Sequence, residues 1–285
     1  MGARLALWRA AAGLVGQAAR LERALALLAA ALLRRDELRR RLADGWEGCG
    51  GGDDDSGLRP FEAELYARHL LAGERVLLLG CGSGRDLLAL AARGHEVVGL
   101  DYSPPALERC RARLDAAGVR ASLVAGAIED VAPAGSFGAV VFSWMTASFV
   151  PEREQRVRAL RRLAACLAPG GRIIASYLRR PPGTRRRGPA LARALAALVP
   201  GGWRPETGDE IYLSRIARCA QVHYQHLFTD AELRAEAEAA GLRVSQQGDV
   251  DDGQDGYAVL EPRPAERNAS SAAAIADASG RTPKS

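Results

Sequence analysis

The chain has 285 residues, 48% of them hydrophobic, a length that suits one α/β domain with extensions or at most two small domains. Its formal net charge of +5 is unevenly placed, because residues 1–44 hold nine arginines against four acids and the remainder is close to neutral. A domain that follows a polyphosphate backbone is usually basic itself, so the composition argues against nucleic acid as a partner.

The cysteines and the apolar runs indicate a reduced, cytoplasmic protein. The five cysteines are odd in number, widely spaced and without a C-x-x-C pair, so we expect neither a disulfide framework nor a bound metal. No uncharged apolar run approaches the roughly eighteen residues that span a bilayer. Arg9 interrupts the first apolar stretch and no cleavage site follows it, so we expect no signal peptide.

The first 44 residues are predicted to be a helical extension, with one long helix over residues 4–43. An apolar stripe flanked by arginines repeats there at alternating steps of three and four residues. The stripe consists of Leu14, Ala18, Leu21, Leu25, Leu28 and Leu32. Because it is rich in alanine and leucine and poor in aromatic residues, it favours packing on its own domain or on a sister subunit over a membrane surface or a partner helix.

A linker rich in glycine and aspartate, residues 45–57, precedes a domain that we place at residues 58–261. After a helix at 59–71, strands and helices alternate with short turns. The expected elements are strands at 75–79, 96–100, 120–124, 139–143 and 172–177 and helices at 85–93, 105–117 and 152–167. This rhythm predicts an α/β fold with a doubly wound, mostly parallel sheet covered by helices on both faces.

The C-terminal part predicts fewer elements. A helix near 189–198 and a strand near 221–227 follow an arginine- and proline-rich loop. A helix at 230–240 begins with a capping box formed by Thr229 and Glu232, and a last strand lies near 257–260. Residues 262–285 are rich in alanine and serine and contain no aromatic residue, so we expect a disordered tail.

The strongest functional signal is a buried strand that runs into glycines at every second position, Gly80, Gly82 and Gly84, and then directly into a helix. Glycines let the backbone turn sharply and approach a ligand closely. The start of the helix offers unpaired N–H groups and a partial positive charge to an anionic group. Arg85 stands where a dinucleotide-binding loop would have its last glycine or alanine, so the spacing argues against NAD.

Asp101 ends the second strand, where a carboxylate can accept hydrogen bonds from both hydroxyls of a ribose. The alternative role is an N-cap for the helix at 105–117, but Ser103 suits that role better. We favour the ribose role. We also expect an exposed carboxylate, whose removal would weaken ligand binding while hardly changing the stability of the fold.

Two further segments complete the pattern: Gly126-Ala-Ile-Glu-Asp130, which precedes a strand ending at Ser143, and Leu167-Ala-Pro-Gly-Gly171, which turns into the next strand. In their order and spacing, the four motifs resemble the class I S-adenosylmethionine-dependent methyltransferases, with a domain similar to methyltransferase types 11 and 25. The resemblance covers about 100 residues. It implies a Rossmann-like sheet of seven strands, S-adenosylmethionine as the cofactor and methyl transfer as the reaction.

The resemblance also implies roles for individual residues. The glycine loop would lie under the methionine portion of the cofactor, Tyr102 beside the adenine, and the strand end at Ser143 under the methyl group. Leu78 stands where many members have an acid, so Asp86 becomes a candidate for the cofactor's amino group, with complementarity to the helix dipole as the equal alternative. The expected cofactor-binding residues are Gly80, Cys81, Gly82, Gly84, Asp86, Asp101, Tyr102, Ala127, Ile128 and Ser143.

The acceptor side has weaker signals. A general base is needed only for an acceptor that must lose a proton. His223 and His226 are three residues apart on a predicted strand and therefore face opposite sides; we select His223 as the candidate base, with a structural histidine as the alternative for either. Trp144 either lines an aromatic pocket or belongs to the core.

The loop Arg179–Arg187 contains five arginines and no acid. It either binds an acidic acceptor or is a solvated loop.

The preferred function is methylation of a small molecule in the cytoplasm. The alternatives are an RNA or protein methyltransferase that uses this loop, and an inactive, cofactor-binding partner subunit. In the last case the N-terminal helix would be the contact surface, as it would be in a homodimer.

Overall fold

A seven-stranded sheet forms the centre of the protein. The structure, a computed structural model, describes residues 2–48, 57–130, 134–181, 188–216, 219–250, 253 and 255–263. Its strands are β1 (Arg75–Leu79), β2 (Glu96–Asp101), β3 (Ser122–Ala125), β4 (Phe137–Phe142), β5 (Leu167–Leu178), β8 (Leu242–Val250) and β9 (Asp255–Pro262). The helices are α1 (Gly2–Ala30), α2 (Arg35–Gly48), α3 (Pro60–His69), α4 (Arg85–Ala91), α5 (Pro104–Ala117), α6 (Arg153–Ala165), α7 (Gly188–Ala196) and α8 (Asp230–Ala239), with a 3₁₀ turn η1 (Thr146–Phe149). A second sheet consists of β6 (Asp209–Ile216) and β7 (Cys219–His226).

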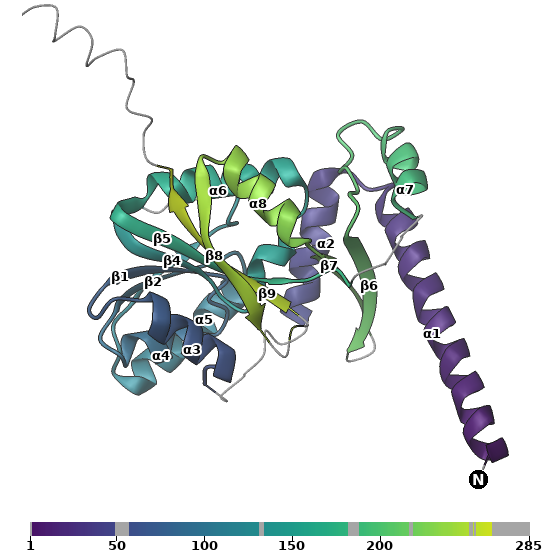
Figure 1. Cartoon of the computed structure of the whole chain (residues 1–285), viewed down its shortest axis with the longest axis horizontal. Coiled ribbons are helices and arrows are strands. Elements are labelled where there is room, and N and C mark those ends of the chain that lie inside the picture. Colours follow the sequence, from purple (N-terminus) through teal and green to yellow (C-terminus); the bar gives the residue numbers. More distant parts are fainter. Residues whose placement is uncertain are drawn as a thin grey trace, which may run out of the picture.

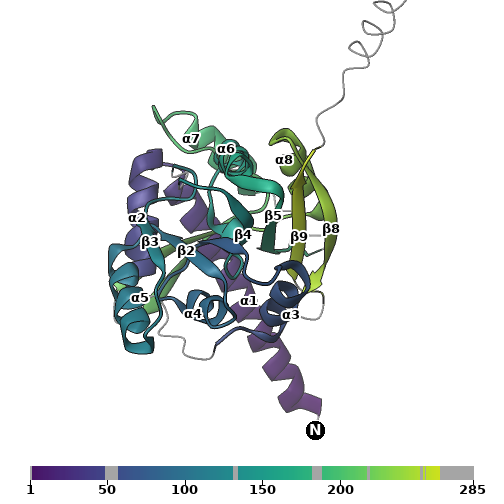
Figure 2. The same ribbon diagram turned by 90° about the vertical axis from the view of Figure 1, so that its left-hand side faces the viewer.

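The main sheet confirms the doubly wound, mostly parallel architecture. Its strand order is β3-β2-β1-β4-β5-β9-β8, and only β9 runs antiparallel to its two neighbours, β5 and β8. Helices α6 and α8 cover one face and α3, α4 and α5 the other (Figures 1 and 2). The order reverses between β1 and β4, and ligands of such sheets bind at the carboxyl ends of the strands beside this reversal.

Several expected elements differ in the structure. The helix predicted at 4–43 is two helices, because the backbone N–H of Arg35 donates to Gly201 O (3.0 Å) and that of Arg34 to the carboxylate of Glu37 (2.8 Å), which starts a new helix. The strand predicted at 221–227 exists as β7 but pairs with β6 instead of entering the main sheet. Strands β6 and β8 were not predicted, since their sequences mix polar and apolar residues without strict alternation. The tail from residue 264 and most of the 45–57 linker lie outside the described residues.

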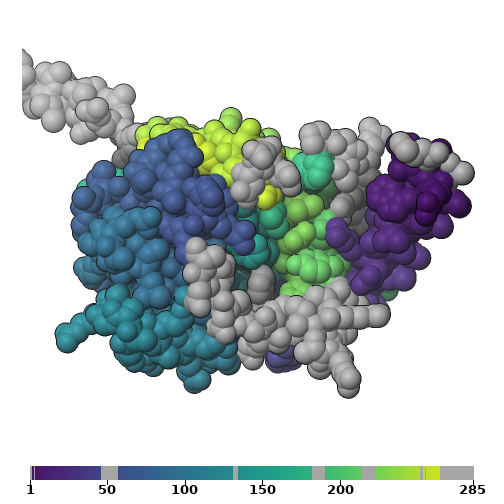
Figure 3. Space-filling view, turned by 90° about the horizontal axis from the view of Figure 1, so that it is seen from below, coloured from purple at the N-terminus to yellow at the C-terminus, as the bar shows by residue number. Residues whose placement is uncertain are grey.

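The N-terminal helices pack against α7, β6 and β7 at one end of the molecule, and we call this group the cap lobe (Figures 1 and 3). Trp203 is fully buried at its centre, where its Nε1 donates to Ala30 O (2.7 Å) and its ring meets Tyr224 edge-on. Helix α2 lies so close to β7 that a Cβ atom on Gly45 would come 2.4 Å from Val222 O. The first part of α1 projects away from the body. Among the described residues, no helix has the length and apolarity needed to cross a membrane.

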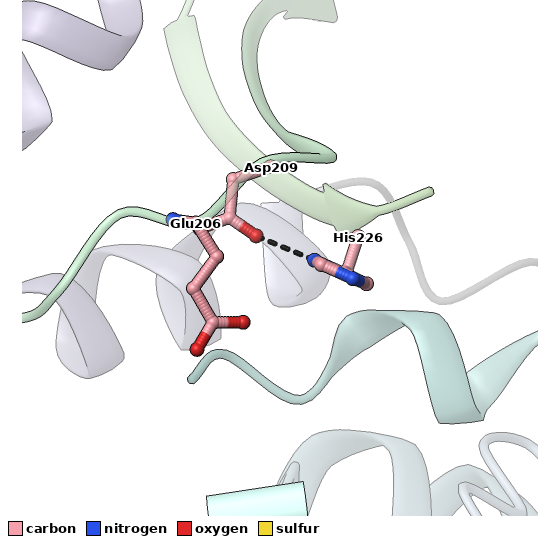
Figure 4. A group of neighbouring side chains, drawn as sticks. All are labelled: Glu206, Asp209 and His226. Atoms are coloured by element: carbon pink, nitrogen blue, oxygen red, sulfur yellow. Dashed lines mark hydrogen bonds and ion pairs between the residues drawn. The ribbon is translucent and has the colours of Figure 1, made fainter. Parts of the chain in front are cut away.

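A buried charged cluster joins the cap lobe to the main sheet (Figure 4). His226, at the end of β7, has its Nδ1 2.7 Å from Asp209 Oδ1 and its Nε2 3.1 Å from Glu232 Oε1 of α8. Burial lowers the pKa of His226, but its hydrogen bonds to the two carboxylates raise it more, so the pKa lies above its usual value. Since both ring nitrogens face acceptors, His226 bridges the two carboxylates as an imidazolium.

This bridge predicts a pH dependence of stability. A histidine with a raised pKa in the folded state stabilises fully below its unfolded pKa of about 6.5, and the contribution is lost as pH rises through the folded pKa. The free energy of unfolding should therefore fall on the alkaline side in the wild type. The fall should be absent in His226→Gln, with a difference in slope of up to about 1.4 kcal/mol per pH unit. Urea denaturation of both proteins between pH 6 and 9 measures it, and equal slopes would contradict the protonated bridge.

Candidate active site

The carboxyl ends of β1, β2 and β4 open into a cavity of about 620 Å³. The segments that follow β1, β2, β3 and β4 line it from the sheet side, and α2 and β7 of the cap lobe line it from the other. All the predicted cofactor-binding residues except Gly84 lie in its wall. The topology therefore brings together residues from four separate segments of the sequence.

The glycine loop has the backbone that its sequence requires. Gly80, Gly82 and Gly84 have φ values of 68°, 52° and 93°, which favour glycine. A Cβ atom on Gly80 would come 2.7 Å from Thr146 Oγ1, and one on Gly84 would come 2.7 Å from Cys110 Sγ, whereas one on Gly82 would meet no atom within 4 Å. Gly84 thus serves helix packing as the N-cap of α4, and Gly82 borders the open space of the cavity.

Asp101 is buried, with 8% of its surface exposed, which corrects the expectation of an exposed carboxylate. Its Oδ2 accepts from the N–H of Gly82 (2.8 Å) and its Oδ1 from the N–H of Ser103 (2.9 Å). Burial raises the pKa of Asp101 against the opposing effect of the backbone N–H groups. Ser103 is the N-cap of α5, as expected, since its Oγ accepts from Ala106 N. Asp101 therefore holds the glycine loop in place in addition to facing the cavity.

Asp86 is the centre of a buried hydrogen-bond network in the first turn of α4. Its Oδ2 accepts from Tyr66 Oη (3.0 Å) and Ser143 Oγ (2.8 Å), and its Oδ1 accepts from Arg85 Nε (2.7 Å). Arg85 also contacts Glu62 at 2.5 Å, and burial together with the Asp86 carboxylate raises the pKa of Glu62 to about 7. The network adds a structural role for Asp86 to the two roles that the sequence suggested.

Trp144 and Met145, directly after β4, have left-handed backbone conformations with φ of 25° and 57°. Such conformations cost of order 1–3 kcal/mol each in residues other than glycine and persist only where their surroundings enforce them. Here the N–H of Met145 donates to Ser176 Oγ (3.0 Å). The turn leaves the Trp144 side chain 39% exposed in the cavity wall, so Trp144 is a pocket residue and not part of the core.

The structure does not bring His223 to the cavity. His223 is buried in β7 with its ring stacked on Tyr212 (centroids 5.2 Å apart), and burial lowers its pKa. Its neighbour Tyr224 lines the cavity instead, because successive side chains of a strand point to opposite faces. The wall formed by the described residues contains no histidine.

Sequence reasoning missed the residues that the cap lobe contributes. Arg39, Arg40, Leu42 and Ala43 of α2 line the cavity, and Arg39 pairs with Glu129 (2.5 Å) beside the segment predicted to border the adenine. The leucine pattern of the N-terminal helix indicated a packed face without naming what it packs against. No local signal could have found these residues.

Glu206, Asp209 and His226 lie close enough together to hold a metal ion (Figure 4). Their ligand atoms already have partners, however. Glu206 pairs with the buried Arg156 (2.7 Å), and Asp209 accepts from Tyr224 Oη and from the N–H of Glu206, both at 2.7 Å. A cation would stand beside Arg156 and the His226 imidazolium, so we assign no metal to this cluster.

Known proteins are similar to this chain in sequence and in fold. A family model of the methyltransferase domain matches residues 76–171. Over 202 residues, the chain is 31% identical to the ubiquinone biosynthesis O-methyltransferase of Xanthomonas axonopodis pv. citri (strain 306), which covers 70% of this chain and 75% of that protein. Over 168 residues, it is 34% identical to the trans-aconitate 2-methyltransferase of Methylobacterium radiotolerans, covering 58% and 59%. The CcbJ methyltransferase of Streptomyces caelestis has the same fold, with a TM-score of 0.57 at 20% identity over 78% of this chain and 96% of that one.

The match to the domain falls on the four motifs that the sequence singled out, and the first three of them border the cavity at the carboxyl end of the sheet. The alignment to the ubiquinone biosynthesis O-methyltransferase spans 202 residues, so the similarity reaches well beyond the glycine loop. The chain therefore belongs to the class I S-adenosylmethionine-dependent methyltransferases.

Proposed function

We propose that the cavity binds S-adenosylmethionine with the glycine loop beneath its methionine portion, Asp101 on its ribose and Tyr102 beside its adenine. The observation that carries this proposal is that one cavity collects the predicted residues of three separate motifs. The geometry suits the group. Gly82 leaves open space, Asp101 retains acceptor capacity beyond its backbone hydrogen bonds, and Tyr102 is 38% exposed in the wall.

We propose further that the methyl acceptor is a small organic molecule that enters beside Trp144. The bound cofactor supplies an activated methyl group, so the protein's task is to align the acceptor and exclude water. The cap lobe supports this role, because Leu42, Ala43 and Tyr224 cover the cavity opposite the sheet. The volume of about 620 Å³ lies in the range of small-molecule sites. The names of the relatives, a ubiquinone biosynthesis enzyme and a trans-aconitate enzyme, also support a small acceptor.

Two of the five arginines in the Arg179–Arg187 loop are engaged within the protein. Arg179 pairs with Asp230 (2.9 Å) and Asp249 (2.5 Å), and Arg180 pairs with Glu232 (2.7 Å). Residues 182–187 lie outside the described residues. This pairing weakens the RNA alternative. Our proposal includes a cytoplasmic location, in keeping with the free thiols of Cys81, Cys110 and Cys166.

Cofactor binding should raise the thermal stability of the protein. S-adenosylmethionine or its demethylated product at about 100 times its dissociation constant should stabilise the native state by about 2.7 kcal/mol. NAD should cause no shift, because the loop lacks the dinucleotide-binding spacing. Thermal melting and calorimetric titration with each compound test this. Tight binding of NAD, or neither a melting shift nor heat of binding with S-adenosylmethionine, would contradict the assignment of the cavity.

Tyr102 separates binding from folding better than Asp101, whose removal should weaken both. Stacking of an aromatic ring on a base contributes about 1–3 kcal/mol, so Tyr102→Ala should weaken cofactor binding about 5- to 150-fold. Its free energy of unfolding without ligand should change by less than about 0.5 kcal/mol, since the side chain is partly exposed. Tyr102→Phe keeps the ring and should bind nearly normally. Calorimetry on the three proteins decides the matter, and an unchanged affinity in Tyr102→Ala would remove Tyr102 from the adenine site.

We also propose that α1 contacts a second copy of this chain. Its leucine stripe lies opposite the face that packs in the cap lobe through Leu27 and Ala30, and it is exposed. The exposed stripe differs from the one named in the sequence: it lacks Leu28, which packs against the cap lobe, and Leu32, which follows α1. It consists of Leu7, Ala11, Leu14, Ala18, Leu21 and Leu25, a seven-residue repeat typical of paired helices. Arg4 and Glu22, the one acid of α1, are five helical turns apart and therefore on the same side. An antiparallel pair brings Arg4 near Glu22 of the partner subunit.

This proposal predicts a dimer in solution. Analytical ultracentrifugation of the full chain should give twice the monomer mass, and Leu14→Glu with Leu21→Glu should give the monomer, because charges would face each other across the stripe. Leu198→Glu is the matched control, since Leu198 is 78% exposed and lies outside the stripe, just after α7. A monomeric wild type that instead binds anionic vesicles through α1 would assign the stripe to a membrane surface.

A further inference from the structure

Among the described residues, one cation in the wall of the cavity has no carboxylate partner. Arg39 pairs with Glu129, Arg40 with Asp36, and Arg85 with Glu62 and Asp86. Arg59 differs: within the described part of the chain, its guanidinium makes no ion pair with a carboxylate, and it lies over the Trp144 ring, 5.4 Å from the centroid. A cation at the edge of a ligand cavity attracts an anionic group, and arginine can bind a carboxylate through two parallel hydrogen bonds.

The surface next to Arg59 is aromatic. The strained turn after β4 presents Trp144 to the cavity, and the Phe149 ring lies 6.1 Å from it between centroids. Tyr224 of the cap lobe also lines the cavity but is only 1% exposed, so Trp144 and Phe149 supply the aromatic surface. Flat side chains of this kind favour a flat, conjugated ligand, which stacks on them at little cost in conformational freedom.

The described wall holds no free general base. It contains no histidine. Each of its carboxylates already has partners. Asp86 accepts hydrogen bonds from Tyr66, Ser143 and Arg85. Glu129 pairs with Arg39, and Asp101 accepts from backbone N–H groups. A phenol or alcohol acceptor would have to lose its proton to one of these groups. An acceptor whose oxygen is already ionised at neutral pH needs no base.

From these three observations, and resting on the proposed function, we infer that the acceptor is a planar, conjugated carboxylic acid, held by Arg59 and stacked on Trp144. One carboxylate oxygen pairs with Arg59, which orients the group. The other oxygen uses a lone pair to form a bond to the methyl carbon, while the carbon–sulfur bond breaks and its electron pair stays on sulfur. The product is a methyl ester, and no proton moves in the step.

Binding of a matched pair of probes tests the inference. 2-Naphthoate and its neutral isostere 2-naphthamide are titrated into the full chain saturated with the demethylated cofactor product, S-adenosylhomocysteine. The carboxylate should bind about ten- to a hundredfold more tightly than the amide. Arg59→Gln should remove this preference, and Trp144→Ala should weaken both probes while Trp144→Phe restores them. Arg68→Gln is the control and should change nothing, because Arg68 lies near the far end of α3, the helix that begins directly after Arg59, and pairs with Glu64 at the surface.

A second readout tests the absence of a base. With methyl-labelled cofactor and 2-naphthoate, the product should be the methyl ester, formed at a rate that does not change between pH 6 and 9. A rate that rises with pH, or equal affinity for naphthoate and naphthamide in the wild type, would overturn the inference. The affinity for S-adenosylhomocysteine, measured in every variant, separates the two proposals. If the wild type fails to bind it, the proposed function fails; if it binds without a preference for the carboxylate, only the acceptor class is wrong.

Discussion

The active site depends on a few backbone hydrogen bonds that hold the glycine loop against the end of β2. The N–H groups of Gly80 and Cys81 donate to Leu100 O (2.8 and 3.1 Å), and that of Gly82 donates to the carboxylate of Asp101 (2.8 Å). These bonds require a left-handed backbone, which side chains with a Cβ disfavour. The carboxylate proposed to bind the ribose is thus the same group that fixes the loop, and this couples ligand affinity to folding at Asp101.

The cap lobe adds a second wall to the open edge of the sheet and so forms the cavity. It is assembled from the N-terminal helices and from the insert between β5 and α8, segments that lie far apart in the sequence. Its junction with α6 and α8 is charged, with His226 between Asp209 and Glu232 and with Arg156 between Glu206 and Glu236. Buried charges are costly without partners, so the lobe is held where every charge is paired.

Backbone strain is concentrated at the end of the cavity that we propose receives the acceptor. Two successive residues other than glycine, Trp144 and Met145, have positive φ values directly after β4. The hydrogen bond from the Met145 N–H to Ser176 Oγ ties this turn to β5, which pairs with β4 in the main sheet. The result is an aromatic side chain held in the cavity wall beside Arg59, at the strand end where the family resemblance places the transferred methyl group.

The sequence by itself determined the cofactor half of the molecule. Between residues 75 and 178, the strands and helices follow from local apolar runs, and the glycines indicate the backbone conformation of the loop. These features could therefore be predicted without knowing any distant contact. Only the tertiary structure decided the acceptor half. Whether His223 or Tyr224 reaches the cavity depends on how β7 pairs with β6, and Arg39 reaches Glu129 only because α2 packs on that hairpin. The burial of Asp101 likewise depends on the loop folding back over it. Contacts between residues that lie far apart in the chain are set by packing and leave no local periodicity, which is the physical reason that the sequence pattern did not contain them.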